Sequence, residues 1–282
     1  MYKGYKPFTN KLKGDLRMSI LSERAKSVQD MPIDGVFVIY GDSGSGKTEL
    51  ASSFPKTKEK PMLILDILEG GTGSISVGNR DHVQVVNIDS FQELDEVLTD
   101  VENGFTIDAN GNKLPAEYST IVIDSATQLE FLLKKYVMES AGKDQMNLNL
   151  WGQAKNGHDQ IWNLCKYLHK KTGANIVVIC LPKEVQDEKD PSFNKVIPNL
   201  MNSAAYGLCA KASFVWYTKV EKDSVVDPKT QEVKEEKKFF TYIDAHPYLL
   251  TKCRKPKEVQ IPEKVQNLNY AKFKKNVIDK IK

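Results

Sequence analysis

The sequence lacks long apolar runs, and none approaches the roughly 20 residues that a membrane-spanning helix requires. Its first residues, MYKGYKPFTNKLKGDLRM, also lack the apolar centre of a secretory signal peptide. Cysteine is scarce, and the four that occur have neither CxxC spacing nor histidines placed as zinc ligands. These absences argue against a membrane protein, a zinc knuckle and a disulfide framework. We therefore expect a cytoplasmic protein with reduced thiols and no membrane partner.

A strong excess of one charge is also absent. Forty basic residues against 37 acidic residues give a formal net charge of +3. The overall electrostatic field is therefore too weak to identify a nucleic-acid partner, and any such contact must come from local patches. Hydrophobic residues make up 40% of the chain, which suits a folded soluble protein rather than a disordered one.

A chain of 282 residues can bury a sizeable core. We expect one core over residues 31–254 with an appendage at each end. Residues 1–30 carry lysine and arginine around few apolar positions, which indicates either a basic arm followed by a short helix or a solvated leader. Residues 255–282 are rich in lysine and are expected to form a basic tail.

Four continuous apolar runs, rich in β-branched residues, are typical of strands buried on both faces of a sheet. Segments with helical apolar spacing, such as residues 91–101 and 129–137, lie between them. Strands that alternate with helices predict right-handed crossovers and a mostly parallel sheet. The runs are GVFVIY from Gly35, MLIL before Asp66, TIVI before Asp124 and NIVVIC ending at Cys180, with a weaker HVQVVNI near Val85.

The pattern changes after Pro182. FVWYTKV and KFFTYID are strand-like segments separated by the turn residues DPKTQ, which predicts an antiparallel hairpin. The predicted fold class is therefore α/β, a doubly wound and mostly parallel sheet with a C-terminal antiparallel hairpin extension.

Residues 41–48 read GDSGSGKT and match the phosphate-loop pattern G-x-x-x-x-G-K-[ST] completely, between a predicted strand and a predicted helix. Glycines let backbone N–H groups approach phosphate oxygens at the helix N-terminus. Lys47 neutralises the β and γ phosphates, and Thr48 offers a hydroxyl to Mg²⁺. The loop predicts ATP and Mg²⁺ as cofactors. Its nucleotide-binding residues are Gly41, Asp42, Ser43, Gly44, Ser45, Gly46, Lys47, Thr48 and Glu49.

Carboxylates that follow the apolar runs add the remaining chemistry. Asp124 is predicted to be the Walker B acid, which holds Mg²⁺ through water. Hydrolysis also needs a base that orients water toward the γ phosphate. Glu69 is the first candidate because Gly70 and Gly71 leave room beside the phosphates, and Asp66 is the alternative.

Three segments, GDSGSGKTELASSFP, LILDILEGGTGSI and STIVIDSATQLE, resemble the phage-encoded RecA-like P-loop ATPases of the single-strand annealing and recombination type. The resemblance spans roughly residues 36–254. It implies a RecA-like core, a catalytic glutamate at Glu69, and a Walker B strand that ends in Asp124 and Ser125. It further implies homo-oligomers with ATP at the subunit interfaces, binding of single-stranded DNA, and a phage protein that acts in the host cytoplasm.

The sequence departs from this family at two places. The strand after the Walker B helix ends in Leu181 and Pro182, where the family has a polar residue that senses the γ phosphate. Lys183 is a candidate substitute for that sensor. The strand end that carries Glu69 is one residue longer than usual, which keeps Asp66 as the alternative base.

Late in the chain, LLTKCRKPKE resembles the Lys-x-Arg element with which related ATPases reach the phosphate of the neighbouring subunit. Lys252 and Arg254 are therefore candidate trans-acting finger residues. A basic surface tail is the plain alternative.

DNA contacts are expected in residues 142–158 and 183–202, which are polar and carry scattered lysines. Trp151 either stacks on a base or anchors a helix in the core. The candidate DNA contacts are Lys143, Trp151, Lys155, Lys183 and Lys195.

These observations predict an ATP-binding and ATP-hydrolysing RecA-like protein that acts on single-stranded DNA in phage-type recombination, annealing or replication. Two other classes stay open. A regulatory nucleotide-binding switch would bind ATP without turnover. A P-loop phosphotransferase would need a lid with arginines over the phosphates, and Arg80 is the only arginine between the phosphate loop and Lys252.

Overall fold

A computed structural model describes residues 35–186, 192–226 and 233–281. All the described residues belong to one compact unit, Ile33–Lys282. The basic arm predicted over residues 1–30 lies outside the described residues, and the division into arm, core and tail stays a prediction. Within the described ranges, no helix combines the length and the apolar character that a membrane span needs.

The core of the described residues is a nine-stranded sheet in the order β13-β11-β10-β1-β7-β6-β2-β3, with β12 paired to β10. Neighbours from β10 to β3 in this order run parallel. The four apolar runs form β1, β2, β6 and β7, and every residue of these strands is buried. The parallel strands are β1 Val36–Gly41, β2 Met62–Ile67, β3 Val83–Ile88, β6 Thr120–Asp124, β7 Asn175–Cys180 and β10 Phe214–Val226.

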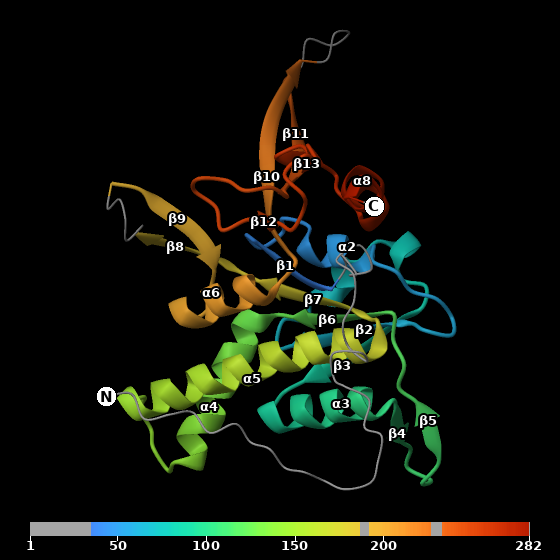
Figure 1. Ribbon diagram of the computed structural model, residues 1–282, viewed down its shortest axis with the longest axis vertical. Helices are drawn as coiled ribbons and strands as arrows, with labels where there is room; N and C mark the ends of the chain where they lie inside the picture. The colour runs from blue at the N-terminus through green and yellow to red at the C-terminus, as the bar shows by residue number, and fades with distance from the viewer. Residues whose placement is uncertain (1–34, 187–191, 227–232, 282) are drawn as a thin grey trace, which may run out of the picture. The chain divides into compact units, whose positions relative to one another are not determined.

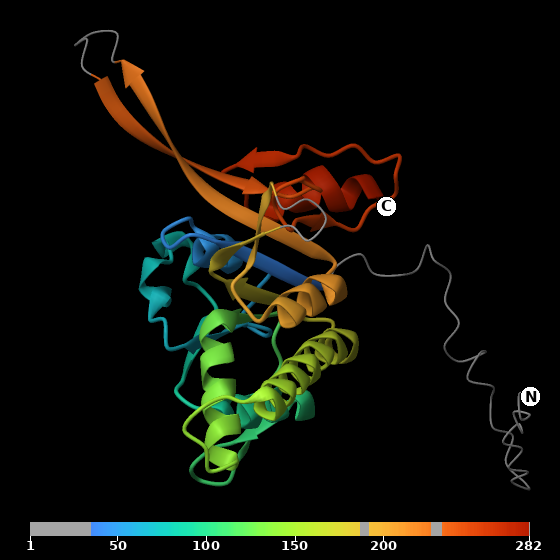
Figure 2. The same ribbon diagram turned by 90° about the vertical axis from the view of Figure 1, so that its left-hand side faces the viewer.

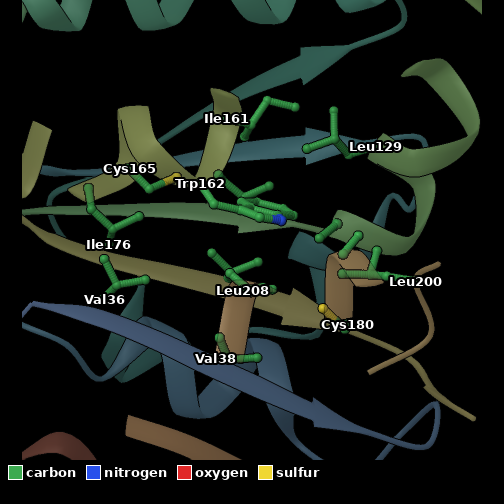
Figure 3. Close-up of a cluster of buried hydrophobic side chains, with 14 of the residues drawn as sticks. Val36, Val38, Leu129, Ile161, Trp162, Cys165, Ile176, Cys180, Leu200 and Leu208 are labelled. Atoms are coloured by element: carbon green, nitrogen blue, oxygen red, sulfur yellow. The ribbon is translucent and has the colours of Figure 1, made fainter. Parts of the chain in front are cut away.

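Helices cover both faces of this sheet (Figures 1 and 2). Successive side chains of a strand point to opposite faces, so Val36 and Val38 join the core under α4, α5 and α6 while Phe37 and Ile39 join the core on the side of α2. Figure 3 shows the first of these cores, where Trp162 reaches between the strands and helices. The predicted doubly wound α/β class is confirmed. The main helices are α2 Lys47–Ser52, α3 Phe91–Asn103, α4 Ala126–Ser140, α5 Leu148–Thr172 and α6 Asn202–Lys211.

The C-terminal segment completes the second face. It contains β13 Lys264–Gln266, α7 Tyr270–Phe273, the π-helical turn Lys274–Ile278 and α8 Asp279–Ile281. The Phe273 ring lies 4.7 Å from that of Trp216 and 5.9 Å from that of Phe37, measured between centroids. Full burial of such a ring contributes about 1.5–3 kcal/mol. This segment, in red in Figure 1, is therefore packed on the sheet.

Antiparallel strands extend the sheet beyond β10. Strand β11, Val233–Tyr242, pairs with β10 and with β13, and β12, Lys252–Cys253, pairs with the start of β10. The predicted C-terminal hairpin is therefore present, and Figure 2 shows it rising away from the helices. Two smaller hairpins join β4 Phe105–Ile107 to β5 Lys113–Pro115, and β8 Pro182–Gln186 to β9 Asn194–Pro198.

Candidate functional site

The glycine-rich loop of residues 41–48 connects β1 to α2. A Cβ atom on Gly41 would lie 2.2 Å from the backbone oxygen of Thr218, so only glycine fits beside β10. Gly44 and Gly46 have φ angles of 76° and 85°, which other residues rarely adopt. Ser45 Oγ lies 2.7 Å from Thr218 Oγ1 and fastens the loop to β10. The loop therefore has the geometry of a backbone cradle for an anion.

Lys47 lies over this cradle. Its Nζ donates to the backbone oxygens of Gly41 and Asp42, at 2.9 and 2.8 Å. Burial lowers the pKa of Lys47, and the carboxylates of Asp124 and Glu69 oppose that shift. An entering phosphate can take over the contacts that the ammonium now makes with carbonyl groups, because charge-assisted bonds are the stronger kind.

Thr48 and Asp124 meet where β1 and β6 end. Thr48 Oγ1 donates to Asp124 Oδ2 at 2.8 Å. Burial raises the pKa of Asp124 to about 6, with Glu69 and Asp66 adding to the rise and Thr48 and Lys47 opposing it. Proteins hold Mg²⁺ beside phosphates with a small number of oxygen ligands, and a hydroxyl and a carboxylate are suitable ones. The donor set fits that ion, and the described residues contain no cluster of three His, Cys, Asp or Glu side chains that would bind a metal unaided.

Asp66 and Glu69, the two candidates for the base, occupy different positions. Asp66 is 4% exposed, and its Oδ1 accepts from the backbone N–H groups of Glu69 and Gly70 at 3.2 and 2.9 Å. The turn that it holds contains two left-handed residues, Leu68 with φ 57° and Gly70 with φ 63°. Glu69 lines the cavity, and its Oε1 accepts from Ser125 Oγ at 2.8 Å. The geometry therefore directs Glu69 toward a bound molecule and Asp66 toward the backbone.

Glu49 is turned away from the phosphate cradle. Its carboxylate accepts bonds from Ser76 N and Oγ and from Asn79 Nδ2. Burial raises the pKa of Glu49, but these bonds lower it overall. Glu49 thus fixes the rim formed by the 3-10 turns Gly71–Ser74 and Val77–Asn79, and the motif alone gave no sign of this contact.

The loop, Glu69 and Asp124 open into one cavity of about 1140 Å³. Leu181 lines it at the position where a polar sensor was expected, while Lys183 Nζ donates to Leu200 O and does not line it. Sequence reasoning missed the opposite wall, since no local pattern connects those residues with the loop. That wall consists of Phe239, Thr241, Asn267, Leu268, Asn269 and Ala271.

The two finger candidates lie at the start of β10. Lys252 Nζ donates to the backbone oxygens of Cys209, Ala210 and Ala212, at 3.1, 3.1 and 2.7 Å, and so caps the C-terminal end of α6. Arg254 N donates to Ser213 O, whereas the phosphate loop lies beside Thr218. About 17 Å of strand separates these two points. A finger role in a neighbouring subunit stays a prediction for both residues.

The DNA-contact candidates fall into two groups. Lys143, Trp151 and Lys155 lie at the junction of α4 and α5, and Trp151 is 37% exposed with Lys134 Nζ 4.8 Å from its ring centroid. Lys183 and Lys195 lie on hairpin β8–β9. Sequence reasoning missed an exposed ring pair beside the hairpin, whose members have centroids 5.5 Å apart: Phe193 and Tyr248, 44% and 46% exposed.

Comparison with known proteins adds one finding about this region. A family model described as an AAA domain matches residues 35–254. The matched range contains the phosphate loop, Glu69 and Asp124 but ends before β13 and α7. A search of curated proteins found none that matches the chain.

Proposed function

Because the chain belongs to the AAA domain family of nucleotide-binding P-loop ATPases, we propose that it hydrolyses ATP with Mg²⁺, using Glu69 as the base, and couples this reaction to single-stranded DNA in a RecA-like manner. The observation that carries the proposal is the convergence of Lys47, Thr48, Asp124 and Glu69 on one cavity. These side chains come from the ends of three strands, and the hydrogen bonds from Thr48 to Asp124 and from Ser125 to Glu69 orient them.

The reaction assigns one task to each of these side chains. Lys47 and the loop amides neutralise the β and γ phosphates, and Thr48 and Asp124 hold the metal site. Mg²⁺, when bound, offsets charge that develops on the phosphate oxygens. Glu69 accepts a proton from water as the water oxygen bonds to the γ phosphorus, and the bond from that phosphorus to the β–γ bridging oxygen breaks to release ADP. Asp66 is the positioning residue that holds the Glu69 turn.

Action on single-stranded DNA is supported by the surface of hairpin β8–β9. Phe193 and Tyr248 offer exposed rings on which bases stack, and Lys195 adds a positive charge. Lys183 contributes less, because its ammonium is already bonded to Leu200 O. Leu181 lines the cavity and immediately precedes β8, so a change of the bound nucleotide could be transmitted through Leu181 to this surface. Recombination, annealing and replication all require such a strand-binding surface.

Homo-oligomers with ATP at the subunit interfaces belong to the same proposal. Arg254 lies too far from the phosphate loop of its own chain to serve it, so a finger role requires a second subunit. Mixing Lys47→Ala with Arg254→Ala tests this directly. Recovered hydrolysis in the mixture, where each variant alone is inactive, supports a finger supplied in trans, and an inactive mixture contradicts it.

Steady-state phosphate release from ATP, with and without single-stranded DNA and at two salt concentrations, tests the function. We expect DNA to raise the rate and salt to weaken DNA binding. Phe193→Ala should reduce the stimulation, while Tyr167→Ala, which removes a ring of similar exposure from α5, should not. A hydrolysis rate that does not change when DNA is added would keep the ATPase activity in the proposal and rule out its coupling to DNA.

A further inference from the structure

The cavity has a charged end and an uncharged end. Lys47, Asp124 and Glu69 lie at the first, around the loop that cradles phosphate. The second is the wall formed by Phe239, Thr241, Asn267, Leu268, Asn269 and Ala271, and no member of it carries a charge. A triphosphate can bind at the charged end through its negative charges. It has no apolar or aromatic group that could bind to the uncharged wall. The uncharged wall suits an aromatic, hydrogen-bonding group instead.

Strand register brings this wall to the phosphate loop. Thr241 pairs with Thr218, whose hydroxyl contacts Ser45 in the loop, so this face of the hairpin looks toward the cradle. Phe239, two residues before Thr241, lies on the same face. A Cβ atom placed on Gly46 would lie 3.5 Å from Phe239 Cδ1, and the ring is 38% exposed. The ring therefore stands next to the loop with an open surface.

Residues 267–271 extend the wall past α2. Asn267 N donates to Phe239 O, and Tyr270 N donates to Ser53 Oγ just after α2. Lys272 Nζ bonds to the backbone oxygen of Asn267. Both backbone groups of Asn267 are thus engaged, while its side-chain amide has no hydrogen bond to any described residue. Asn267 is one of the residues that line the cavity.

The size of the cavity agrees with a whole nucleotide. Ligand pockets commonly enclose about 300–1,000 Å³, and this cavity, at about 1140 Å³, lies at the large end and has room for a whole nucleotide. The space continues from the phosphate loop along Glu49, Leu50 and Ser53 of the α2 side to the uncharged wall. A ligand held only by the loop would leave that part filled with water.

We propose that the uncharged wall is the base subsite of the nucleotide site, where adenine stacks on Phe239 and is read by the side-chain amide of Asn267. The side-chain amide carries an NH₂ donor group beside a C=O acceptor, which together match the ring-nitrogen acceptor and the adjacent N6 donor of adenine. Guanine presents two acceptors on the corresponding edge and is matched better by arginine, which the wall lacks. This inference rests on the proposed nucleotide site and assigns it a base subsite in which Phe239 lies within the matched family range, whereas Asn267 lies beyond its end at residue 254.

Calorimetric titration of the full chain with Mg²⁺ and ATP, GTP or inorganic tripolyphosphate tests the subsite. Base stacking and bidentate base reading each contribute about 1–3 kcal/mol, so wild type should bind ATP at least about tenfold more tightly than GTP or tripolyphosphate. Phe239→Ala should weaken ATP about tenfold and leave tripolyphosphate unchanged. Asn267→Gly should abolish the preference for ATP over GTP, and glycine accepts the φ of 49° at that position.

The control is Phe240→Ala, because Phe240 points to the other face of β11, where Lys264 Nζ lies 4.3 Å from its ring centroid. It should leave all three affinities unchanged, and thermal melting should show that every variant is folded. Equal affinity of wild type for ATP and tripolyphosphate overturns the base subsite but keeps the phosphate site. Variants that keep full ATP affinity, or that lose ATP and tripolyphosphate together, also overturn it. Failure of wild type to bind any of the three ligands contradicts the proposed function itself.

Discussion

One end of the cavity carries charge and the other carries none, and the two ends are also built differently. The charged end consists of a continuous loop, residues 41–48, and of side chains at the ends of the adjacent strands β2 and β6. The uncharged wall comes from β11 and from residues 267–271, about 200 residues further along the chain. In the proposed function, the charged side chains bind phosphate and carry out hydrolysis, and in the proposed base subsite the neutral wall selects the group attached to the phosphate. The comparison separates catalysis from specificity within one cavity.

The sharpest way to break this comparison is to replace Glu69, the proposed base at the charged end. Glu69→Gln should lower ATP hydrolysis by about 10³-fold, because a positioned general base contributes 10²–10⁴-fold. ATP affinity should stay close to that of wild type, since the phosphate loop is unchanged. Phosphate release and calorimetric titration measure the two quantities.

Asp66→Asn is the matched variant, because it keeps the shape of the other candidate and alters only the acceptor of the Glu69 and Gly70 amides. It should reduce the rate by a smaller factor. A larger loss with Asp66→Asn than with Glu69→Gln would exchange the roles of the two carboxylates.

The second test asks whether the neutral wall is part of the folded core. Phe273→Ala should lower the free energy of unfolding by about 3–5 kcal/mol, the usual cost of emptying a buried aromatic site. Phe131→Ala, which removes a 58% exposed ring of α4, should change it little. Urea unfolding measures both. If Phe273→Ala left the midpoint unchanged, the C-terminal segment would be an independent lid rather than a fixed wall.

A third test uses a carboxylate of α4 that contributes to neither end of the cavity. Burial raises the pKa of Glu130, but the His158 imidazole, Lys134 and the Met201 N–H group lower it to about 2 overall. His158 Nε2 lies 3.3 Å from Glu130 Oε2 but is not aligned for a hydrogen bond. The hydrogen bonds to the Glu130 carboxylate come from Lys134 Nζ and from the backbone N–H of Met201. The folded pKa lies below the unfolded one, so this stabilisation is present above pH 4.5 and is lost as the pH falls toward 2.

Between pH 5 and pH 2, wild type should therefore lose roughly 2–3 kcal/mol more unfolding free energy than Glu130→Gln. Urea unfolding at several pH values measures the difference. If the unfolding free energies of the two proteins fell equally between pH 5 and pH 2, the lowered pKa of Glu130 would be contradicted. A change in ATP affinity that accompanies the substitution would show that α4 is coupled to the cavity.

The smallest effect is expected at Lys252, the finger candidate whose ammonium already bonds to the end of α6. Lys252→Met should cost about 1 kcal/mol of stability, because it removes a cation from the C-terminal end of α6. Hydrolysis should then be unaffected, whereas Arg254→Ala should lower it. Thermal melting and phosphate release distinguish the two residues. A large loss of hydrolysis in Lys252→Met would restore that lysine as a finger.

Residues with local signals could be predicted from the sequence, and residues placed by long-range register could not. The strands before Gly41, Asp66 and Asp124 are continuous apolar runs, and they became fully buried strands. FVWYTKV was expected in a hairpin, but nothing indicated that β10 would also run parallel to β1. That pairing brings Thr218 against Ser45.

The C-terminal segment shows the same limit. Residues 255–282 are rich in lysine and are predicted to form a basic tail, and within this segment Phe273, Val277 and Ile278 are buried against the sheet. Their partners, such as Phe37 and Trp216, lie far away in the sequence, so no short window reveals the contact. The wall that holds Asn267 depends on that packing. The neutral wall could therefore not be predicted from the sequence, whereas the phosphate loop could.

Phosphate release from ATP and Mg²⁺ by wild type and by Lys47→Ala, prepared side by side, tests the central claim most directly. Lys47 is the charged group bonded to the loop itself, through Gly41 and Asp42. We predict turnover in wild type, loss of that turnover on removal of Mg²⁺ by chelation, and a fall of about 10²-fold or more in Lys47→Ala. Equal rates in the two proteins, or no ATP binding and no turnover in wild type, would contradict the account.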